Sequence, residues 1–535
     1  MIVVVDFGSQ TTHLIGRRIR ELGGEIKILS PEKILPSIQN DKSIKGIILS
    51  GGPASVYEKG APTADPKIFS LGIPILGICY GLQLIAHLLG GKVISGKKEY
   101  GPSQLKIGNL KLKIISKLPQ QFTVWMSHGD EVVSVPKGFK TLGSTEHVPF
   151  AFVEDSKRKI IGLQFHPEVE HTENGRQILE NFVDLSESRH PDRVSKRAEG
   201  SFSTTYVERD SLTSLGMTNR KLEEIIRNIK QTVGESYVIG AVSGGVDSTV
   251  AGVLSAKAIG KQFIPVYVDN GLMREGNLEH VKKIFTKHAN VSPIVVNAVG
   301  EMLKRLRGIT DSEKKRKIIG NFYIDIFERI RKKLLKKNLP VKFLLQGTIY
   351  SDVIESQGTK HAAKIKSHHN VGGLPKDMKL KLLEPLKNFY KDEVKAIGRA
   401  LGLEEEFVNK QPFPGPGYAV RIRGEVTRKR LGQEKKADEI VLSELKRAGI
   451  MENVFLSFPV MTGAYSTAVK GDGRHFDEVV ALRIVESKDI MTSTWSRLPY
   501  EVLQKISSRI VNEVPNISRV VYDITTKPPA TMEWE

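Results

Sequence analysis

A single cysteine, Cys79, stands in the stretch GICYGLQ, closely flanked by Gly77 and Gly81. An apolar run typical of a buried strand precedes it, and an apolar run with helical spacing follows it. A strand–turn–helix elbow lifts a nucleophile above the edge of a sheet, and the positive end of the helix favours a thiolate. A free cysteine is more often a small buried hydrophobe. The elbow is therefore what predicts a nucleophile here.

The stretch LQFHPE, residues 163–168, offers the base that such a thiol needs. His166 ends an expected strand, Pro167 cannot extend the sheet, and Glu168 can return to orient the imidazole. A lone histidine at a strand end is more often a satisfied structural residue. Next to a nucleophilic Cys79, the interpretation changes to a general base with its orienting carboxylate.

A second glycine loop, SGGVDST, covers residues 243–249 between an expected strand and an expected helix. Small residues let backbone N–H groups and the helix N-terminus face an anion, and Ser243, Ser248 and Thr249 add hydroxyl donors. No lysine precedes the Ser-Thr pair, so the Walker pattern is absent. A plain glycine turn with Asp247 as helix cap is the competing interpretation.

Both sites need α/β scaffolds to position them. Short apolar runs alternate with helical segments over residues 1–188, a pattern that favours a mainly parallel sheet. A polar stretch at 189–206 predicts a linker, and a second α/β series follows over 207–409. Proline and glycine cluster around residue 412, and residues 410–535 mix strands and helices. The predicted fold class is two parallel-sheet α/β domains followed by a smaller α+β domain.

Composition narrows the functional classes. The net charge is +20, but the basic helical patches lack interleaved aromatic residues, which favours solvated faces over a nucleic-acid groove. One cysteine excludes an internal disulfide and a cysteine-based zinc cluster. No apolar run reaches about 18 residues, so no membrane span is expected. The first expected strand begins at residue 1, which leaves no room for a signal peptide, and we expect a cytoplasmic protein.

Two family resemblances sharpen these interpretations. GICYGLQ resembles the elbow of class I glutamine amidotransferases, and SGGVDST resembles the PP-loop of ATP pyrophosphatases. Segments along the whole chain, in the correct order, resemble the GMP synthetase family. They are VDNGLMR (268–274), KRKIIGNFY (315–323), QGTIYSDVIES (346–356), IKSHHNVGGLP (365–375), PFPGPG (412–417) and VVYDITTKPPATMEWE (520–535).

The amidotransferase resemblance implies a glutaminase with Cys79, His166 and Glu168 as its catalytic residues. Backbone N–H groups of Gly52, in LSGGP, and of Tyr80 would stabilise the oxyanion of the tetrahedral intermediate. The remaining implied contacts are with the glutamine substrate: Gln83, Ser127, His128, Gly129 and Asp130.

The resemblance of the second half implies a synthetase that adenylates XMP. ATP-binding residues would be Ser243, Gly244, Gly245, Val246, Asp247, Ser248, Thr249 and Val268. Asp247 would help to hold Mg²⁺, a cation that prefers oxygen ligands. A lid near the reacting groups would carry Lys364, Lys366, His368 and His369. The XMP phosphate would meet Arg519, Lys527, Met532 and Glu533, the glutamate through its backbone N–H because its carboxylate would repel the ligand.

The implied activity joins the two halves. Glutamine is hydrolysed to glutamate and ammonia, which displaces AMP from adenyl-XMP to give GMP, and the C-terminal domain of the family implies a homodimer. Gln411 and Met532 depart from the bacterial pattern, which leaves XMP affinity and subunit contacts open. Alternatives are a tRNA-modifying PP-loop enzyme or other nucleic-acid-binding protein, and an NAD synthetase. The amidotransferase half argues against the first, and the HPE stretch argues against the second.

Overall fold

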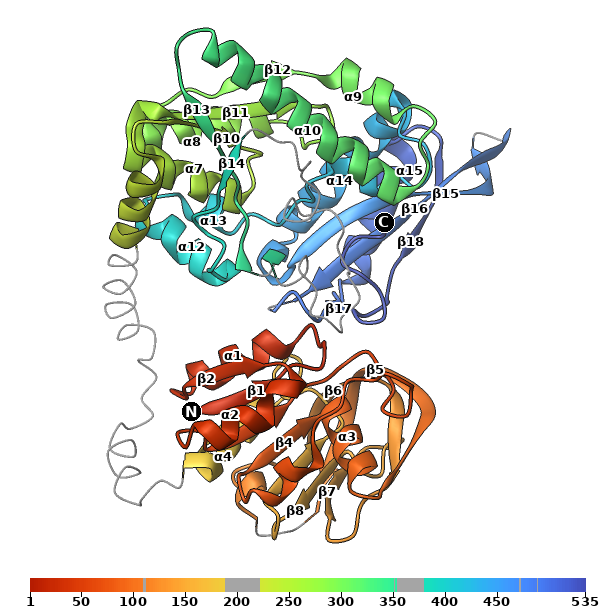
Figure 1. Cartoon of the computed structure of the whole chain (residues 1–535). Helices are drawn as coiled ribbons and strands as arrows, with labels where there is room; N and C mark the ends of the chain where they lie inside the picture. The colour runs from red at the N-terminus through yellow and green to blue at the C-terminus, as the bar shows by residue number, and fades with distance from the viewer. Residues whose placement is uncertain (109–111, 188–221, 351, 354–379, 471–472, 488) are drawn as a thin grey trace.

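The computed structural model describes residues 1–108, 112–187, 222–350, 352–353, 380–470, 473–487 and 489–535 (Figure 1). The described residues form three sheets, each in its own part of the chain. The predicted fold class is confirmed, with two α/β units followed by a smaller α+β unit. The linker expected at 189–206 lies outside the described residues.

The first unit is built on a nine-stranded sheet in the order β2-β1-β3-β4-β9-β8-β7-β5-β6. The expected parallel part runs from β2 to β9, but β8, β7, β5 and β6 extend it with antiparallel pairs. Its strands are β1 (Ile2–Val5), β2 (Ile26–Leu29), β3 (Gly46–Leu49), β4 (Ile75–Ile78), β5 (Lys92–Ile107), β6 (Gln121–Ser134), β7 (Lys140–Ser144), β8 (Phe152–Asp155) and β9 (Ile160–Leu163). Its α-helices are α1 (Thr12–Glu21), α2 (Ile34–Asn40), α3 (Tyr80–Leu88) and α4 (Gly175–Glu187).

The second unit has an all-parallel sheet in the order β12-β11-β10-β13-β14. Its strands are β10 (Tyr237–Ala241), β11 (Phe263–Asp269), β12 (Ile294–Asn297), β13 (Val341–Leu345) and β14 (Lys381–Leu383). The α-helices are α7 (Val246–Ile259), α8 (Asn277–Ala289), α9 (Val299–Leu306), α10 (Ser312–Leu335), α12 (Lys391–Ala400) and α13 (Glu405–Val408). Because β10 is central and parallel to both neighbours, the loop after its carboxyl end is where a ligand is expected.

The third unit is a mixed sheet with two long helices. The antiparallel pair β15 (Leu456–Lys470) and β16 (Gly473–Glu486) is joined by β17 (Thr494–Trp495), and β18 (Ile517–Tyr522) runs parallel to β16. The helices are α14 (Arg428–Arg447) and α15 (Tyr500–Glu513). One buried cluster includes Ile239 and Phe322 of the second unit with Val480 and Ile506 of the third. The second and third units therefore share a hydrophobic core.

The first unit lies beside this two-part body (Figure 1) and has its own buried clusters. Hydrogen bonds and an ion pair, not a shared core, join the two. Nδ1 of His13, in α1, and the hydroxyl of Tyr350 form a hydrogen bond of 2.8 Å. Arg17 forms an ion pair with Asp392 of α12. Further contacts join residues 170–171 to the loop between β16 and β17. Within the described ranges, no helix has the length and hydropathy needed to cross a membrane.

Candidate active sites

Cys79 lies on a strained elbow between β4 and α3. It has φ 53° and ψ −105°, a positive-φ conformation outside the αL region that costs energy for any residue with a Cβ. A Cβ on Gly81 would overlap the carbonyl of Leu49, and one on Gly77 would lie 2.7 Å from the carbonyl carbon of Gly81. The flanking glycines therefore permit the tight packing that the elbow requires.

The imidazole of His166 lies between the thiol and a buried carboxylate. Its Nδ1 is 2.8 Å from Oε1 of Glu168, which is fully buried, and Cys79 is a second neighbour that affects its pKa. Burial alone would lower the pKa of His166, but the charge of Glu168 and the Cys79 contact raise it well above its usual value. Strand β9 ends at Leu163, so His166 follows the strand by three residues instead of ending it.

The LSGGP segment reaches the same place from the end of β3. A Cβ on Gly51 would lie 3.2 Å from Cε1 of His166, and one on Gly52 would lie 3.3 Å from Cγ of Tyr80. Gly52 therefore lies against the side chain of Tyr80, the first residue of α3. The oxyanion role of the two backbone N–H groups stays a prediction.

The residues expected to meet glutamine gather around the carbonyl of Asp130. The amide of Gln83 donates to that oxygen at 2.8 Å, and Nδ1 of His128 lies 3.0 Å from it. The carbonyl of Ser127 accepts from the thiol of Cys79 at 3.6 Å, and Tyr57 donates to the Asp130 carboxylate at 3.0 Å. A Cβ on Gly129 would meet nothing within 4 Å, so this strand segment borders open space.

Gln164 is a neighbour of the thiol that the sequence interpretation missed. Its amide nitrogen lies 3.8 Å from Sγ of Cys79, and the side chain is fully buried. It follows the end of β9 at Leu163, so strand alternation does not extend to it, and only the folded structure places it beside the thiol.

Residues 243–245 of the PP-loop motif connect β10 to α7, and residues 246–249 form the first turn of that helix, as the sequence predicts for a strand–loop–helix motif. Gly244 has φ 79°, and the hydroxyls of Ser243 and Ser248 lie 3.0 Å apart across the loop. Thr249 is fully buried behind the loop. Val246 and Val268 also have buried side chains, the latter in β11, so only the backbone of Val268 remains to meet a ligand.

Asp247 faces a lysine that the sequence interpretation missed. Nζ of Lys391, the first residue of α12, lies 2.7 Å from both carboxylate oxygens of Asp247. The carboxylate is partly exposed, and no group of three or more metal-ligating side chains occurs among the described residues. A single carboxylate beside a phosphate-binding loop fits Mg²⁺ that arrives with ATP, because Mg²⁺ is held by one or two carboxylates plus substrate phosphates.

Two further side chains support the loop from outside the motif. Asn277, at the start of α8, donates to the carbonyl of Ser243 at 2.7 Å. Nζ of Lys410 lies 3.2 Å from Oδ1 of Asn277 and 3.4 Å from the carbonyl of Gly244. Burial, together with nearby Arg274, lowers the pKa of Lys410 to about 8. Asn277 lies 34 residues and Lys410 lies 166 residues along the chain from its partner in the loop, so local pattern analysis could not find either contact.

The predicted XMP-binding residues have different partners in the C-terminal unit. Arg519, in β18, donates to the hydroxyl of Ser466, and Nζ of Lys527 donates to the carbonyl of Ile490. Met532 packs against the cluster that contains Phe458, and the carboxylate of Glu533 is paired with buried Arg421. The predicted lid residues Lys364, Lys366, His368 and His369 lie outside the described residues.

Comparisons with known proteins match these units in the same order. A model of class I glutamine amidotransferases matches residues 3–185, one of NAD synthase matches 218–335, and one of the GMP synthase C-terminal domain matches 443–534. The glutamine-hydrolysing GMP synthase of Aquifex aeolicus is 47% identical over 537 residues, covering 100% of this chain and 99% of that protein. This chain belongs to the glutamine-hydrolysing GMP synthase family.

Other GMP synthases agree along the full length. That of Symbiobacterium thermophilum is 47% identical, and that of Clostridium botulinum strain Langeland is 45% identical, each covering 100% of this chain and 99% of the relative. Because the GMP synthase C-terminal model matches here, the NAD synthase match reflects a common PP-loop unit and not the acceptor. The sequence prediction of family is therefore confirmed.

Proposed function

We propose that this chain is a carbon–nitrogen ligase of guanine nucleotide biosynthesis that makes GMP from XMP, ATP and glutamine. The observation that carries the proposal is the presence, in one chain, of a thiol–imidazole–carboxylate site and a PP-loop, each with its partners in place. The thiol site has Nδ1 of His166 2.8 Å from Glu168, and the PP-loop has Asp247 at the start of α7. Glutamine hydrolysis needs the thiol site and ATP cleavage needs the PP-loop, so the complete reaction needs the two sites together.

In the first half-reaction, Cys79 attacks the carboxamide carbon of glutamine. His166 takes the thiol proton and delivers it to the leaving nitrogen, so that ammonia departs and a glutamyl thioester forms. Glu168 holds the imidazole and balances its positive charge. The backbone N–H groups of Gly52 and Tyr80 stabilise the oxyanion. Water then hydrolyses the thioester to glutamate and restores the thiol.

In the second half-reaction, the C2 oxygen of XMP attacks the α-phosphorus of ATP. The loop of residues 243–248 and the N-terminus of α7 hold the β- and γ-phosphates, which leave as pyrophosphate. Asp247 would hold the Mg²⁺ that accompanies ATP, and that ion would neutralise charge on the departing pyrophosphate. Ammonia attacks C2 of adenyl-XMP, and AMP leaves with its bridging oxygen.

The test is GMP formation with single omissions. Purified full-length chain is given XMP, MgATP and glutamine, and GMP, AMP, pyrophosphate and glutamate are quantified. We expect equal amounts of AMP, pyrophosphate and GMP, and no GMP when XMP or ATP is left out. Ammonium chloride should replace glutamine. Pyrophosphate release that requires tRNA and not XMP would overturn the proposal and support the nucleic-acid alternative.

We also propose that two copies associate through the C-terminal unit. The β15–β16 hairpin extends away from the body of that unit (Figure 1) and exposes Tyr465, Val469 and Phe476, with exposed fractions of 53%, 78% and 70%. The Tyr465 and Phe476 rings stack with centroids 5.7 Å apart. Exposed apolar clusters of this kind mark association surfaces, and the family resemblance favours a second copy as the occupant. Light scattering should give a dimer mass for the native chain and a monomer mass for Phe476→Glu.

Cytoplasmic location and the absence of a nucleic-acid partner also belong to the proposal. Composition supports the first, since the chain has a single cysteine and so cannot form the internal disulfides that oxidising compartments favour. The lack of aromatic residues in the basic helical patches supports the second. Fractionation of cells and a nucleic-acid binding titration at physiological salt would test them.

A further inference from the structure

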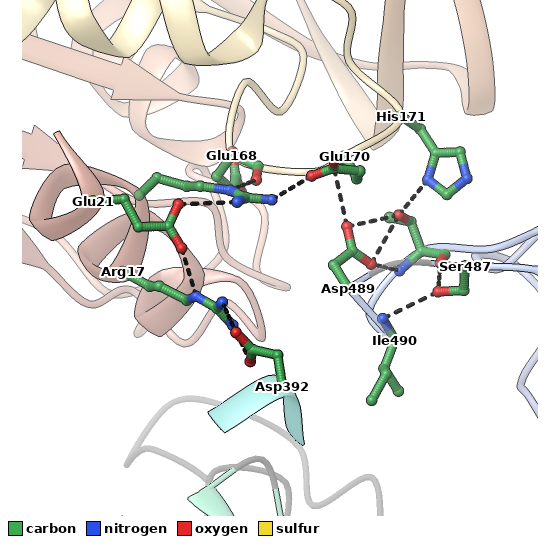
Figure 2. Close-up of polar contacts among 11 residues, drawn as sticks. Arg17, Glu21, Glu168, Glu170, His171, Asp392, Ser487, Asp489 and Ile490 are labelled. Carbon is green, nitrogen blue, oxygen red and sulfur yellow. Dashed lines mark hydrogen bonds and ion pairs between the residues drawn. The ribbon is translucent and has the colours of Figure 1, made fainter. Parts of the chain in front are cut away.

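A loop of the C-terminal unit directly contacts residues 170–171 of the amidotransferase unit, which follow the His166–Glu168 pair in sequence (Figure 2). This docking loop, which we define as residues 487 and 489–492, connects β16 to β17. Oδ2 of Asp489 accepts a 3.0 Å hydrogen bond from the backbone N–H of Glu170. Oγ1 of Thr492 lies 2.6 Å from Nδ1 of His171. Both contacted residues follow Glu168 closely in sequence.

The docking loop is itself firmly built. Oδ1 of Asp489 accepts from the backbone N–H of Thr492 at 2.8 Å, and both its carboxylate oxygens lie 3.1 Å from the Thr492 hydroxyl. The hydroxyl of Ser487 accepts from the N–H of Ile490 and donates to the carbonyl of Thr492. Thr492 is buried. The loop therefore presents Asp489 and Thr492 to the amidotransferase unit in a fixed arrangement.

On the amidotransferase side, one arginine joins the contact to the catalytic carboxylate. Nη2 of Arg18, in α1, lies 2.6 Å from the carboxylate of Glu170, and its Nε donates to the carbonyl of Glu168 at 3.1 Å. Residues 168–170 are thus held by Arg18 of their own unit and by Asp489 of the C-terminal unit. The Glu168 carboxylate is fully buried, so a small backbone shift would change its distance to His166.

A second series of contacts links Thr492 to the backbone of His166 through the stacked rings of His171 and Trp125. The His171 ring packs on Trp125 with ring centroids 4.8 Å apart, and the Trp125 carbonyl accepts from the N–H of His166 at 3.1 Å. The hydroxyl of Thr172 donates to the carbonyl of His166 at 2.6 Å. Thr492, by holding His171, therefore supports the residues that fix His166 on both sides.

We propose that Asp489 and Thr492 are positioning residues for the His166–Glu168 pair, supplied to the glutaminase by the C-terminal unit. The inference rests on the proposed glutaminase roles of these residues. It means that the amidotransferase unit has its full catalytic geometry only when the docking loop is in contact. The physical reason is that catalysis by a base and its orienting carboxylate depends steeply on their separation.

The test compares Asp489→Ala, Asp489→Asn and Thr492→Val in the full chain. We expect Asp489→Ala to lower glutaminase kcat about ten-fold or more, with KM for glutamine little changed because Gln83 and the 127–130 segment are not touched. Asp489→Asn keeps one acceptor oxygen, which can serve the N–H of Glu170 or that of Thr492 but not both, so it should recover only part of the rate. Thr492→Val should lower kcat in the same direction. Ammonia-dependent GMP formation should be unchanged in all three, which also shows that they fold.

Glu501→Gln, an exposed acid-to-amide change at the start of α15, is the matched control and should leave both activities unchanged. Wild-type glutaminase kcat in Asp489→Ala would overturn the inference. Equal loss of the glutamine- and ammonia-dependent reactions would also overturn it, since the loop would then act within its own unit. Retention of glutaminase activity in Cys79→Ala would instead refute the proposed function, so the two failures are distinguishable.

Discussion

The guanidinium of Arg421 holds the carboxylate of Glu533 through Nε and Nη2, each 3.1 Å from its oxygen. Arg421 is fully buried and lies over the rings of Phe413 and Phe458. The sequence prediction placed Glu533 at the XMP phosphate through its backbone N–H, because its carboxylate would repel the ligand. Pairing with Arg421 offsets the charge of that carboxylate, which would reduce its repulsion of a phosphate.

The first prediction concerns this pair. Arg421→Lys keeps the positive charge but cannot form the bidentate pair, so residues 531–533 lose a fixed position. We expect KM for XMP to rise about ten-fold, the equivalent of one charged hydrogen bond of about 1.4 kcal/mol. Steady-state kinetics with ammonia as nitrogen donor would measure it. Glutaminase kcat is the control, and an unchanged KM for XMP would show that the pair is only structural.

The second prediction separates the two sites by removing the thiol. Cys79→Ala should reduce glutamine-dependent GMP formation by about 10⁴-fold or more, because no other group can form the acyl intermediate. The ammonia-dependent reaction should keep its wild-type kcat, because the PP-loop and its partners are untouched. Glutamate release and GMP formation are measured in parallel. Loss of both reactions would contradict separate sites.

The third prediction is the reciprocal change at the PP-loop. Asp247→Asn leaves the loop shape but removes the charge that would hold Mg²⁺ and that pairs with Lys391. We expect XMP-dependent pyrophosphate release to fall by about 100-fold or more, since a metal ion contributes several kcal/mol of charge stabilisation. Glutaminase kcat without XMP serves as the control. Pyrophosphate release at the wild-type rate would rule out a metal-binding role for Asp247.

The fourth prediction follows from the pKa of Lys410, which burial and Arg274 lower to about 8. Below that pH its ammonium, beside Gly244, attracts the phosphates of ATP, and above it the neutral amine does not. We expect kcat/KM for ATP to fall as pH rises through about 8. Lys410→Arg stays charged and should abolish the fall. A wild-type profile that is flat between pH 7 and 9 would exclude Lys410 from ATP binding.

The fifth prediction links His166 to stability. Burial opposes protonation, but Glu168 and Cys79 raise the folded-state pKa of His166 well above the value of about 6.5 in an unfolded chain. The protonated pair therefore stabilises the fold fully below about pH 6.5, and this contribution is lost as pH rises through the folded-state pKa. Glu168→Gln removes it.

Urea denaturation followed by tryptophan fluorescence would test this dependence from about pH 6 upward. The difference in free energy of unfolding between the native chain and Glu168→Gln should be largest at the acidic end and shrink with rising pH. Asp155→Asn, which removes a carboxylate paired with Arg158 instead of a histidine, is a control for general charge effects. A difference that grows with pH would contradict the assigned direction.

Local sequence patterns could predict the elbow, the PP-loop and the His166–Glu168 pair, because each depends on residues a few positions apart. The β5–β6 pair was not predicted, since β5 contains Gly96, Gly101 and Pro102 and lacks a clean apolar alternation. Nor could the sequence alone reveal Lys391, Lys410 or Arg421. Their partners lie 144, 166 and 112 residues away along the chain, and only the folded topology brings them together.

The lone thiol has a practical consequence for every experiment that attaches a probe. Cys79 is the only cysteine in the sequence and is only 5% exposed. A thiol reagent can therefore react at only one residue of this sequence. Its rate of incorporation reports how often the elbow opens to solvent. A fluorescent or spin label meant for any other position needs a background in which Cys79 is first replaced. Conversely, the fraction of chains that gain the mass of one adduct would give the fraction of accessible glutaminase sites in a preparation.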